Sequence, residues 1–174
     1  FFPTIRLRYQ IRYMTYSKTG LFASVQNATI KNLTVENSLI IVNNSVAWKY
    51  AGAIAGGTSA NAKMSNLASK NNVVIVKDTL ANSSEAIAGA IVGFVQNEGV
   101  TLTNSYAIGN KILAKADNTS AYVGGVVGVV GHNNATSEVL VSDVYSVNNT
   151  VYANAKTSFV GGIVGIIQKY GKLT

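Results

Sequence analysis

The 174-residue sequence has no cysteine, one proline and one histidine, and charged residues make up only 12% of it. Without cysteine, neither a disulfide framework nor a cysteine-ligated metal site can form. His132 is the single histidine, and no Gly-x-Ser-x-Gly motif accompanies it as a nucleophile. The seven acidic residues are scattered, whereas a glycosidase requires two facing carboxylates. We therefore predict no catalytic residue, no metal, no cofactor and no enzymatic activity.

Long apolar runs are also missing. The longest stretches, 86–95 and 121–130, have about ten residues, whereas a membrane-spanning helix requires about 20. We expect no membrane span.

Positive charge is concentrated at the beginning of the sequence. The first eighteen residues hold Arg6, Arg8, Arg12 and Lys18 and no acid, within a net charge of +7. Basic and aromatic residues together can bind single-stranded nucleic acid. Here, however, apolar and polar residues alternate strictly over residues 4–16, which favours a long strand, and we expect no nucleic-acid partner.

Asparagine and glycine are abundant, with 19 and 16 residues, and a glycine-spaced apolar segment recurs. Matched positions 19, 52, 89, 124 and 161 are 33, 37, 35 and 37 residues apart. Each full repeat adds an Asn- or Asp-containing run and a β-branched run. The former runs are 31–33, 65–67, 103–105 and 142–144, and the latter are 39–42, 73–76, 111–113 and 151–152.

Three short strand-like runs per repeat, separated by Asn, Ser, Gly and Asp, indicate an all-β fold. Glycine inside the runs costs about 1 kcal/mol per residue in a helix, which argues against helices. We predict a right-handed parallel β-helix, or solenoid, of about five coils with three strands each, preceded by an extended strand. The predicted division is an arm, 1–18, and repeats at about 19–51, 52–87, 88–122, 123–158 and a partial 159–174.

Stacked coils would align chemically similar residues in rows. Asn32, Asn66, Asn104 and Asp143 would form an inner ladder of hydrogen-bonded side chains. The glycine rows have two interpretations. They either let a large opposing side chain approach, or they form a flat strip that docks a partner.

Residues 89–93, Gly-Ala-Ile-Val-Gly, with residues 104–110, Asn-Ser-Tyr-Ala-Ile-Gly-Asn, resemble the GLUG repeat family. Residues 161–165, Gly-Gly-Ile-Val-Gly, are another close match, and the resemblance extends over roughly residues 19–168. It implies a β-solenoid segment of a secreted or surface protein, often adhesive or accessory. The family motif has no catalytic residue to transfer to this chain.

The two ends of the repeat array differ in character. The last glycine segment is followed by only seven residues, so its repeat lacks two strands, while the arm supplies an extra strand. We hypothesise that the arm of one subunit completes the last coil of the next by strand addition, giving a head-to-tail homopolymer. The alternatives are an arm that caps its own solenoid and a fragment of a longer protein. The expected interface residues are Ile5, Leu7, Tyr9, Ile11, Tyr13, Val160, Ile163, Val164 and Ile167.

Asn-x-Ser/Thr occurs seven times, about twice the number expected by chance. The glycosylation candidates are Asn27, Asn43, Asn82, Asn118, Asn134 and Asn148, while Asn32 fits the inner ladder better. Composition alone is the other explanation. We expect an extracellular or cell-surface protein, and two functions remain open. One is a filament-forming structural subunit, and the other is an adhesin segment of a larger GLUG-like protein.

Overall fold

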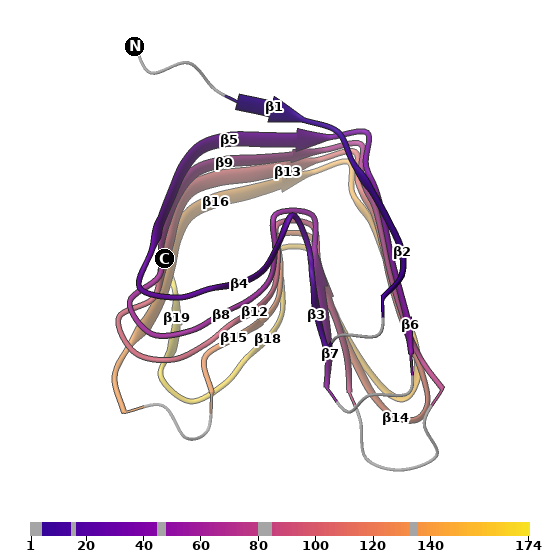
Figure 1. Cartoon of the computed structure of the whole chain (residues 1–174). Coiled ribbons are helices and arrows are strands. Elements are labelled where there is room, and N and C mark those ends of the chain that lie inside the picture. Colours follow the sequence, from indigo (N-terminus) through magenta and orange to yellow (C-terminus); the bar gives the residue numbers. More distant parts are fainter. Residues whose placement is uncertain (1–4, 15–16, 45–47, 80–84, 133–135) are drawn as a thin grey trace.

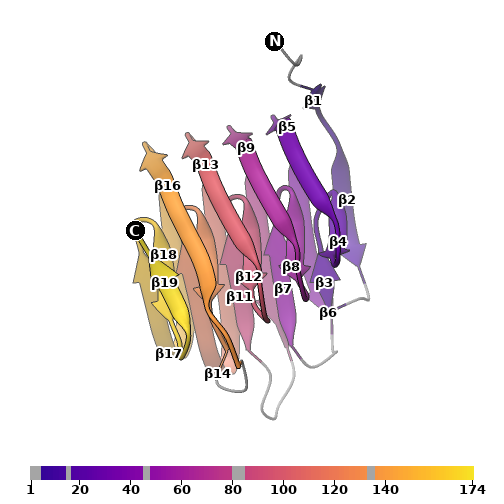
Figure 2. The ribbon, with the colours of Figure 1, turned by 90° about the vertical axis from the view of Figure 1, so that its left-hand side faces the viewer.

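The computed structural model describes residues 5–14, 17–44, 48–79, 85–132 and 136–174. These residues form nineteen strands and no helix, and all strand pairs among them are parallel. The strands wind as a β-solenoid of about four turns (Figures 1 and 2). The predicted all-β parallel solenoid is therefore confirmed, with about one turn fewer than expected.

Three sheets run along the solenoid axis. Sheet A contains β1 (Ile5–Leu7), β5 (Thr29–Glu36), β9 (Lys63–Lys70), β13 (Thr101–Ile108), β16 (Val139–Val147) and β19 (Gly171–Leu173). Sheet B contains β2 (Gln10–Met14), β3 (Lys18–Thr19), β6 (Leu39–Asn44), β7 (Lys49–Gly52), β10 (Val73–Asp78), β11 (Ala86–Gly89), β14 (Lys111–Gly124) and β17 (Thr150–Gly161). Sheet C contains β4 (Phe22–Val25), β8 (Ala55–Thr58), β12 (Val92–Val95), β15 (Val127–Val130) and β18 (Val164–Ile167).

Each coil crosses sheet B twice (Figure 1). The chain leaves sheet A along an outer leg (β2, β6, β10), returns along an inner leg (β3, β7, β11), bends sharply and continues into sheet C. In the last two coils, β14 and β17 each run through both legs, with a register shift between Ala116 and Ser120. The three predicted sheets are present, but the glycine-rich run, predicted as one strand, forms two strands that flank the bend.

The glycines explain the bend, which we call the neck. A Cβ added to Gly93 would lie 2.6 Å from the Gly56 carbonyl oxygen and 2.7 Å from the Ala51 nitrogen. One added to Gly52 would lie 2.5 Å from the carbonyl oxygens of Ala55 and Ile91. Glycine thus lets the inner leg and sheet C approach backbone to backbone. Neither interpretation of the glycine rows anticipated this, because the groups that approach are main-chain atoms.

Left-handed backbone occurs at one residue in each of the four long strands of sheet A, β5, β9, β13 and β16. Asn32, Asn66, Asn104 and Asp143 have φ between 48° and 58°, a region in which Asn and Asp are the favoured non-glycine residues. The Asn66 amide donates to Asn32 Oδ1 at 3.1 Å. The predicted ladder therefore exists at this pair, but its expected inner position is wrong, because Asn66, Asn104 and Asp143 are exposed.

A different row of side chains forms the buried ladder, at the corner between sheet A and the outer leg. Backbone N–H groups donate to side-chain oxygens of the next coil, from Ser38 to Asn72 at 2.8 Å, from Asn72 to Asn110 at 2.9 Å and from Asn110 to Asn149 at 2.7 Å. Asn72 and Asn110 are each 1% exposed. Because a buried donor without a partner costs about 1–3 kcal/mol, this row fixes the corner of every coil.

The core has two parts and one internal ion pair. Alanine, valine, isoleucine and leucine fill the coil interior. A second cluster, Tyr50, Ile87, Phe94, Tyr122 and Val129, joins the inner leg to sheet C. Between the two legs of sheet B, Lys49 Nζ lies 2.7 Å from Asp78 Oδ1, and both side chains are almost completely buried, at 0% and 1% exposure.

The arm pairs with its own chain, as in the self-capping alternative. β1 pairs with β5 and β2 with β6, and the single strand predicted over residues 4–16 is broken at the sheet corner near Tyr9. The Tyr9 N–H donates to Ser38 Oγ at 2.9 Å, and its hydroxyl donates to the Ala53 carbonyl. Tyr9 therefore packs against the end of its own core, and burial raises the pKa of its phenol.

The last residues also differ from expectation. Residues 168–174, predicted to lack a further strand, contain β19, which pairs with β16 through Gly171, Lys172 and Leu173. We call a set of residues that are paired from strand to strand along the axis a column. Lys172 and Leu173 stand in the columns of the residues that begin β13 and β9, so the chain continues sheet A at this point.

Candidate binding surfaces

The coil core is open at both ends of the solenoid. At the β4 end, Phe22 is 40% exposed, although Ala55 and Val92 in the same row are fully buried. At the β18 end, Val160 is 48% exposed, whereas Val123 in its row is fully buried. Each end coil therefore presents to solvent a slice of what is core elsewhere, bordered by unpaired strand edges of all three sheets.

The predicted interface residues divide between these two ends. Ile5 and Leu7 are exposed on β1, Tyr9 is half-buried beside them, and the side chains of Ile11 and Tyr13 lie outside the described part of the chain. At the opposite end, Ile163 and Val164 are half-buried and Val160 and Ile167 are exposed. The structure groups each set at its own end, and a single copy does not bring the two sets together.

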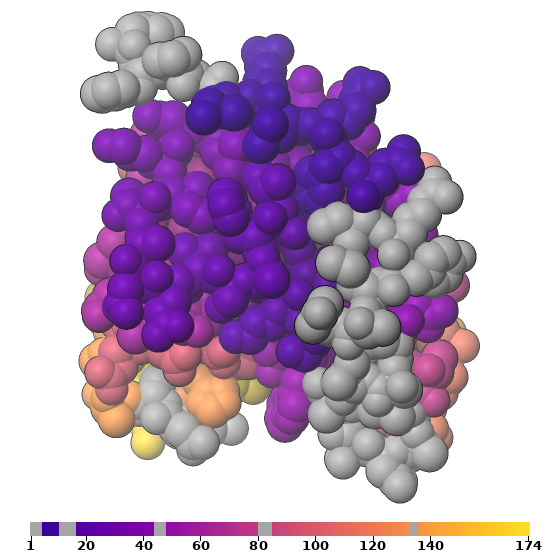
Figure 3. Space-filling model, in the orientation of Figure 1, coloured from indigo at the N-terminus to yellow at the C-terminus, as the bar shows by residue number. Residues whose placement is uncertain are grey.

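A hollow of about 310 Å³ opens at the β1 end, which faces the viewer in Figure 3. It lies over the first half of β5, which β1 leaves uncovered because β1 pairs only with Leu33–Val35. Its lining is Ile5, Leu7, Leu21, Phe22, Thr29, Ile30, Lys31 and Leu33. The sequence singled out Ile5 and Leu7 but missed Phe22 and Ile30, which the register of the neighbouring coil places here.

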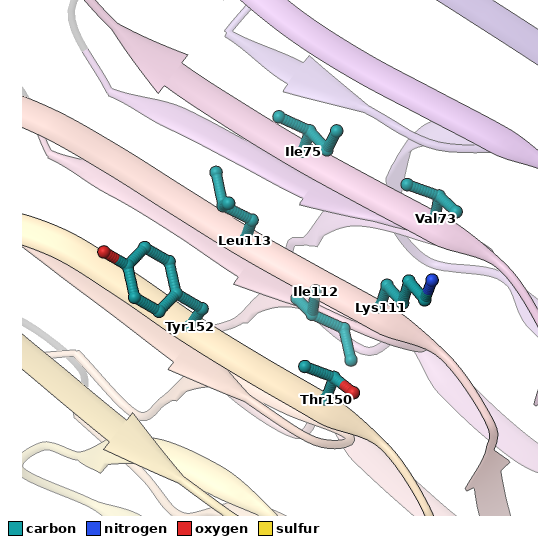
Figure 4. A pocket seen from close by; sticks show the side chains of 7 residues that line it. All are labelled: Val73, Ile75, Lys111, Ile112, Leu113, Thr150 and Tyr152. Carbon is teal, nitrogen blue, oxygen red and sulfur yellow. The ribbon is translucent and has the colours of Figure 1, made fainter.

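The outer leg of sheet B has a second apolar surface, which we call the outer strip. It comprises Leu39, Ile41, Val73, Ile75, Leu113 and Tyr152. Part of it lines a shallow hollow of about 260 Å³ (Figure 4). Exposed lysines border the strip at Lys77, Lys111 and Lys115, and Lys115 pairs with Asp117 at 2.9 Å. Every residue of the runs 39–42 and 73–76 is apolar. Since alternate residues of a strand face opposite sides, these runs indicate an apolar strip on the outside of the coil as well as a core inside it.

A smaller hollow of about 110 Å³ lies at the open side of the second cluster, lined by Trp48, Glu85, Ile87, Phe94, His132 and Gln168. The Tyr122 hydroxyl donates to Glu85 Oε1 at 3.2 Å. Burial raises the pKa of the Glu85 carboxyl, and the Tyr122 hydrogen bond partly offsets this shift. His132 is half-buried and lies 5.9 Å from the Phe94 ring, measured between centroids.

The three hollows are lined mainly by apolar side chains, with a few charged and polar ones. Among the residues that the structure describes, no three His, Asp or Glu side chains lie together where they could hold a metal ion. The same residues include no helix long and apolar enough to cross a membrane. The absence of enzymatic activity stays a prediction.

Four of the six glycosylation candidates, Asn27, Asn43, Asn118 and Asn148, are exposed. Asn27 and Asn148 have left-handed backbone, with φ of 46° and 51°. Asn82 and Asn134 lie outside the described residues. An attached glycan at any of the four exposed positions would project from the solenoid surface, and whether these positions are modified stays a prediction.

Comparison with protein-family models, with curated proteins and with solved structures found no match. The resemblance to GLUG repeats therefore stays a prediction.

Proposed function

We propose that this protein is a structural subunit of an extracellular filament in which copies stack end to end. One observation supports this most directly, namely that core rows buried inside the solenoid become exposed at both ends, as at Phe22 and Val160. Contiguous exposed apolar surface bordered by unpaired strand edges is a template for association.

Head-to-tail contact follows from the repetition. The trailing edge of each coil pairs with the leading edge of the next in all three sheets, so the two ends of the molecule have complementary edges. A contact between two different surfaces, related mainly by translation, does not close and produces a filament. The exposed sequons support an extracellular setting for such a filament.

The pairing of the arm changes how the contact would form. Since β1 and β2 already pair with β5 and β6, the arm offers only its outer edge to another copy. The first coil would therefore dock as a preformed unit, without the insertion of a free strand, which reduces the entropy lost on association.

Negative-stain microscopy of the purified chain tests this function. We expect filaments that disappear in a Val160→Asp/Ile167→Asp variant, because each carboxylate would be placed in an apolar contact. The five strands of sheet C, at about 4.8 Å each, predict an axial repeat of about 24 Å. The matched control is Asn43→Asp/Thr103→Asp, which adds two carboxylates to inner coils. A wild-type chain that stays monomeric at every concentration, or filaments that survive the end substitutions, would contradict the proposal.

The outer strip favours a second candidate function, a cell-surface binding segment. Its apolar side chains and bordering lysines match an anionic lipid surface, where hydrocarbon meets the strip and phosphates meet the lysines. The charge is complementary because three lysines and one nearby acid, Asp117, border the strip.

Co-sedimentation with vesicles tests this second function. We expect binding to phosphatidylglycerol vesicles, weak binding to phosphatidylcholine vesicles and weaker binding at high salt, because exposed charges are screened. Ile75→Asp should reduce the bound fraction at least tenfold, while Thr103→Asp, on sheet A, should leave it unchanged. Equal loss in both variants, or equal binding to both lipids, would show that the strip is not the contact.

A further inference from the structure

Sheet A has a half-strand at each end, and the two halves occupy different columns. β19 pairs with the beginning of β16, so that Lys172 lies beside Leu140 and Leu173 beside Val141. β1 pairs with the later part of β5, from Leu33 to Val35. β19 therefore leaves the later part of β16 uncovered, and β1 leaves the beginning of β5 uncovered.

The register can be followed from coil to coil through the sheet. The column of Leu140 contains Thr101, Lys63 and Thr29. Lys172 of β19 therefore stands in the same column as Thr29 of β5. In the adjacent column, Val141, Leu102 and Met64 lead to Ile30, so Leu173 stands in the column of Ile30.

The column of Ile30 is buried in the inner coils and loses its cover at both ends. Its inner members Met64, Leu102 and Val141 are at most 1% exposed, whereas Leu173 is 37% exposed. Ile30 itself lines the hollow of about 310 Å³ at the β1 end. One end thus has an apolar side chain without cover, and the other has an apolar hollow in the same column.

We infer that the hollow over Thr29, Ile30 and Lys31 is the receptor site for β19 of a second copy of this chain. The site deepens the proposed end-to-end stacking and rests on it. In the joint, β19 adds to the free edge of β5 of the next copy, and Leu173 enters the hollow. β1 of that copy then lies beyond β19 in the same layer, against the uncovered part of β16.

The second half of this joint brings a cation to an aromatic ring. Arg6 of β1 stands in the column of Tyr145, through Thr34, Ala68 and Tyr106. Tyr145 is 51% exposed and stacks on Tyr106 with ring centroids 5.1 Å apart. Arg6 of the next copy would therefore lie over the free face of Tyr145, a favourable cation–π arrangement.

Disulfide cross-linking tests the joint, because the natural sequence has no cysteine. Lys172 and Thr29 are both exposed and would face each other across adjacent strands, about 4.8 Å apart, within the range that a disulfide bridges. Mild oxidation of a Thr29→Cys/Lys172→Cys variant should give a ladder of covalent oligomers on a denaturing gel. Each single variant should give at most dimers.

The matched control is Glu36→Cys/Lys172→Cys. Glu36 lies on the same strand and face as Thr29 but seven residues further along, roughly 20 Å away in the joint. We expect at least tenfold less of the chain in covalent oligomers. Equal ladders in the two variants would mean random collision and would overturn the inference.

The outcomes separate this inference from the proposed function. Filaments by microscopy without a Thr29–Lys172 cross-link would show that copies stack in another register, so that stacking is right and the joint is wrong. A chain that stays monomeric and uncross-linked, with the β-sheet signal of the wild type, would overturn both.

Discussion

Replacing Lys49 with methionine is expected to destabilise the protein by about 3–5 kcal/mol, the usual cost of removing one partner of a buried ion pair. Lys49 and Asp78 lie 2.7 Å apart at 0% and 1% exposure. Without the ammonium group, the Asp78 carboxylate would stay between the two legs of sheet B with its main counter-charge gone. Urea unfolding followed by circular dichroism measures the loss as a lower midpoint.

Two further variants give this prediction its controls. Lys115→Met removes one partner of an exposed pair, with Asp117, and should change stability by less than about 1 kcal/mol. The double variant Lys49→Met/Asp78→Leu removes both charges and should recover most of the loss, because an apolar pair often replaces a buried ion pair without cost. A double variant as unstable as Lys49→Met alone would show that packing, rather than charge, holds the legs together.

The ion pair joins two successive coils, because Lys49 lies on β7 and Asp78 on β10 of the next coil. One coil further along, Ala86 stands in the position of Lys49 and Ala116 in that of Asp78. The ion pair can form only when the strands of the two legs are in this one register. Because the neighbouring positions are alanines, which would tolerate other registers, the pair opposes a shift of one leg relative to the other. The same double variant should therefore keep its stability but fold with less unique register.

Gly93→Ala is expected to destabilise the protein by at least about 2 kcal/mol. The new Cβ would lie 2.6–2.9 Å from main-chain atoms of Gly56 and Ala51. Main-chain atoms of two hydrogen-bonded sheets cannot move apart without disturbing their ladders, so this overpacking falls in the upper part of the usual range of about 1–3 kcal/mol. Urea unfolding measures the change.

Gly162→Ala is the matched control at the same neck. Nothing lies within 4 Å of a Cβ added there, and its φ is outside the left-handed region. Alanine should therefore stabilise the protein by about 0.4–1 kcal/mol, by reducing the freedom of the unfolded chain. If the two substitutions shift the midpoint in the same direction and by similar amounts, the neck does not require close backbone approach.

The sequence predicts the architecture well because the same types of residue recur at matching positions of each repeat. Recurring β-branched runs with Asn and Gly between them indicate parallel stacking, and the structure has it. The sequence did not predict the neck, because a glycine segment with alternating side chains has the pattern of one continuous strand. Whether Gly52 and Gly93 face a side chain or another backbone depends on the neighbouring coils. The pattern of residues within one repeat gives no information on this.

The ladders show the same limit. Asn32 and Asn66 were correctly placed in one row, but their left-handed backbone turns the row outward. The buried row begins at Ser38, where a serine stands in place of asparagine, and so the repeat is less visible there. The sequence predicted the ends only in part, since it did not predict β19. Leu173 is part of a strand because it pairs with Val141 of β16, and this pairing is set by the stacking of the coils.

The strand pairing also determines how the chain reaches its native state. In the buried ladder, successive partners are 34, 38 and 39 residues apart, and all of the strand pairs described are parallel, so hairpins cannot serve as local nuclei. Every strand pair of the first coil requires closure of a loop of a full coil, which makes nucleation slow. Once two coils are paired, each further coil adds to an existing edge, and growth proceeds along the axis as in other linear repeat proteins.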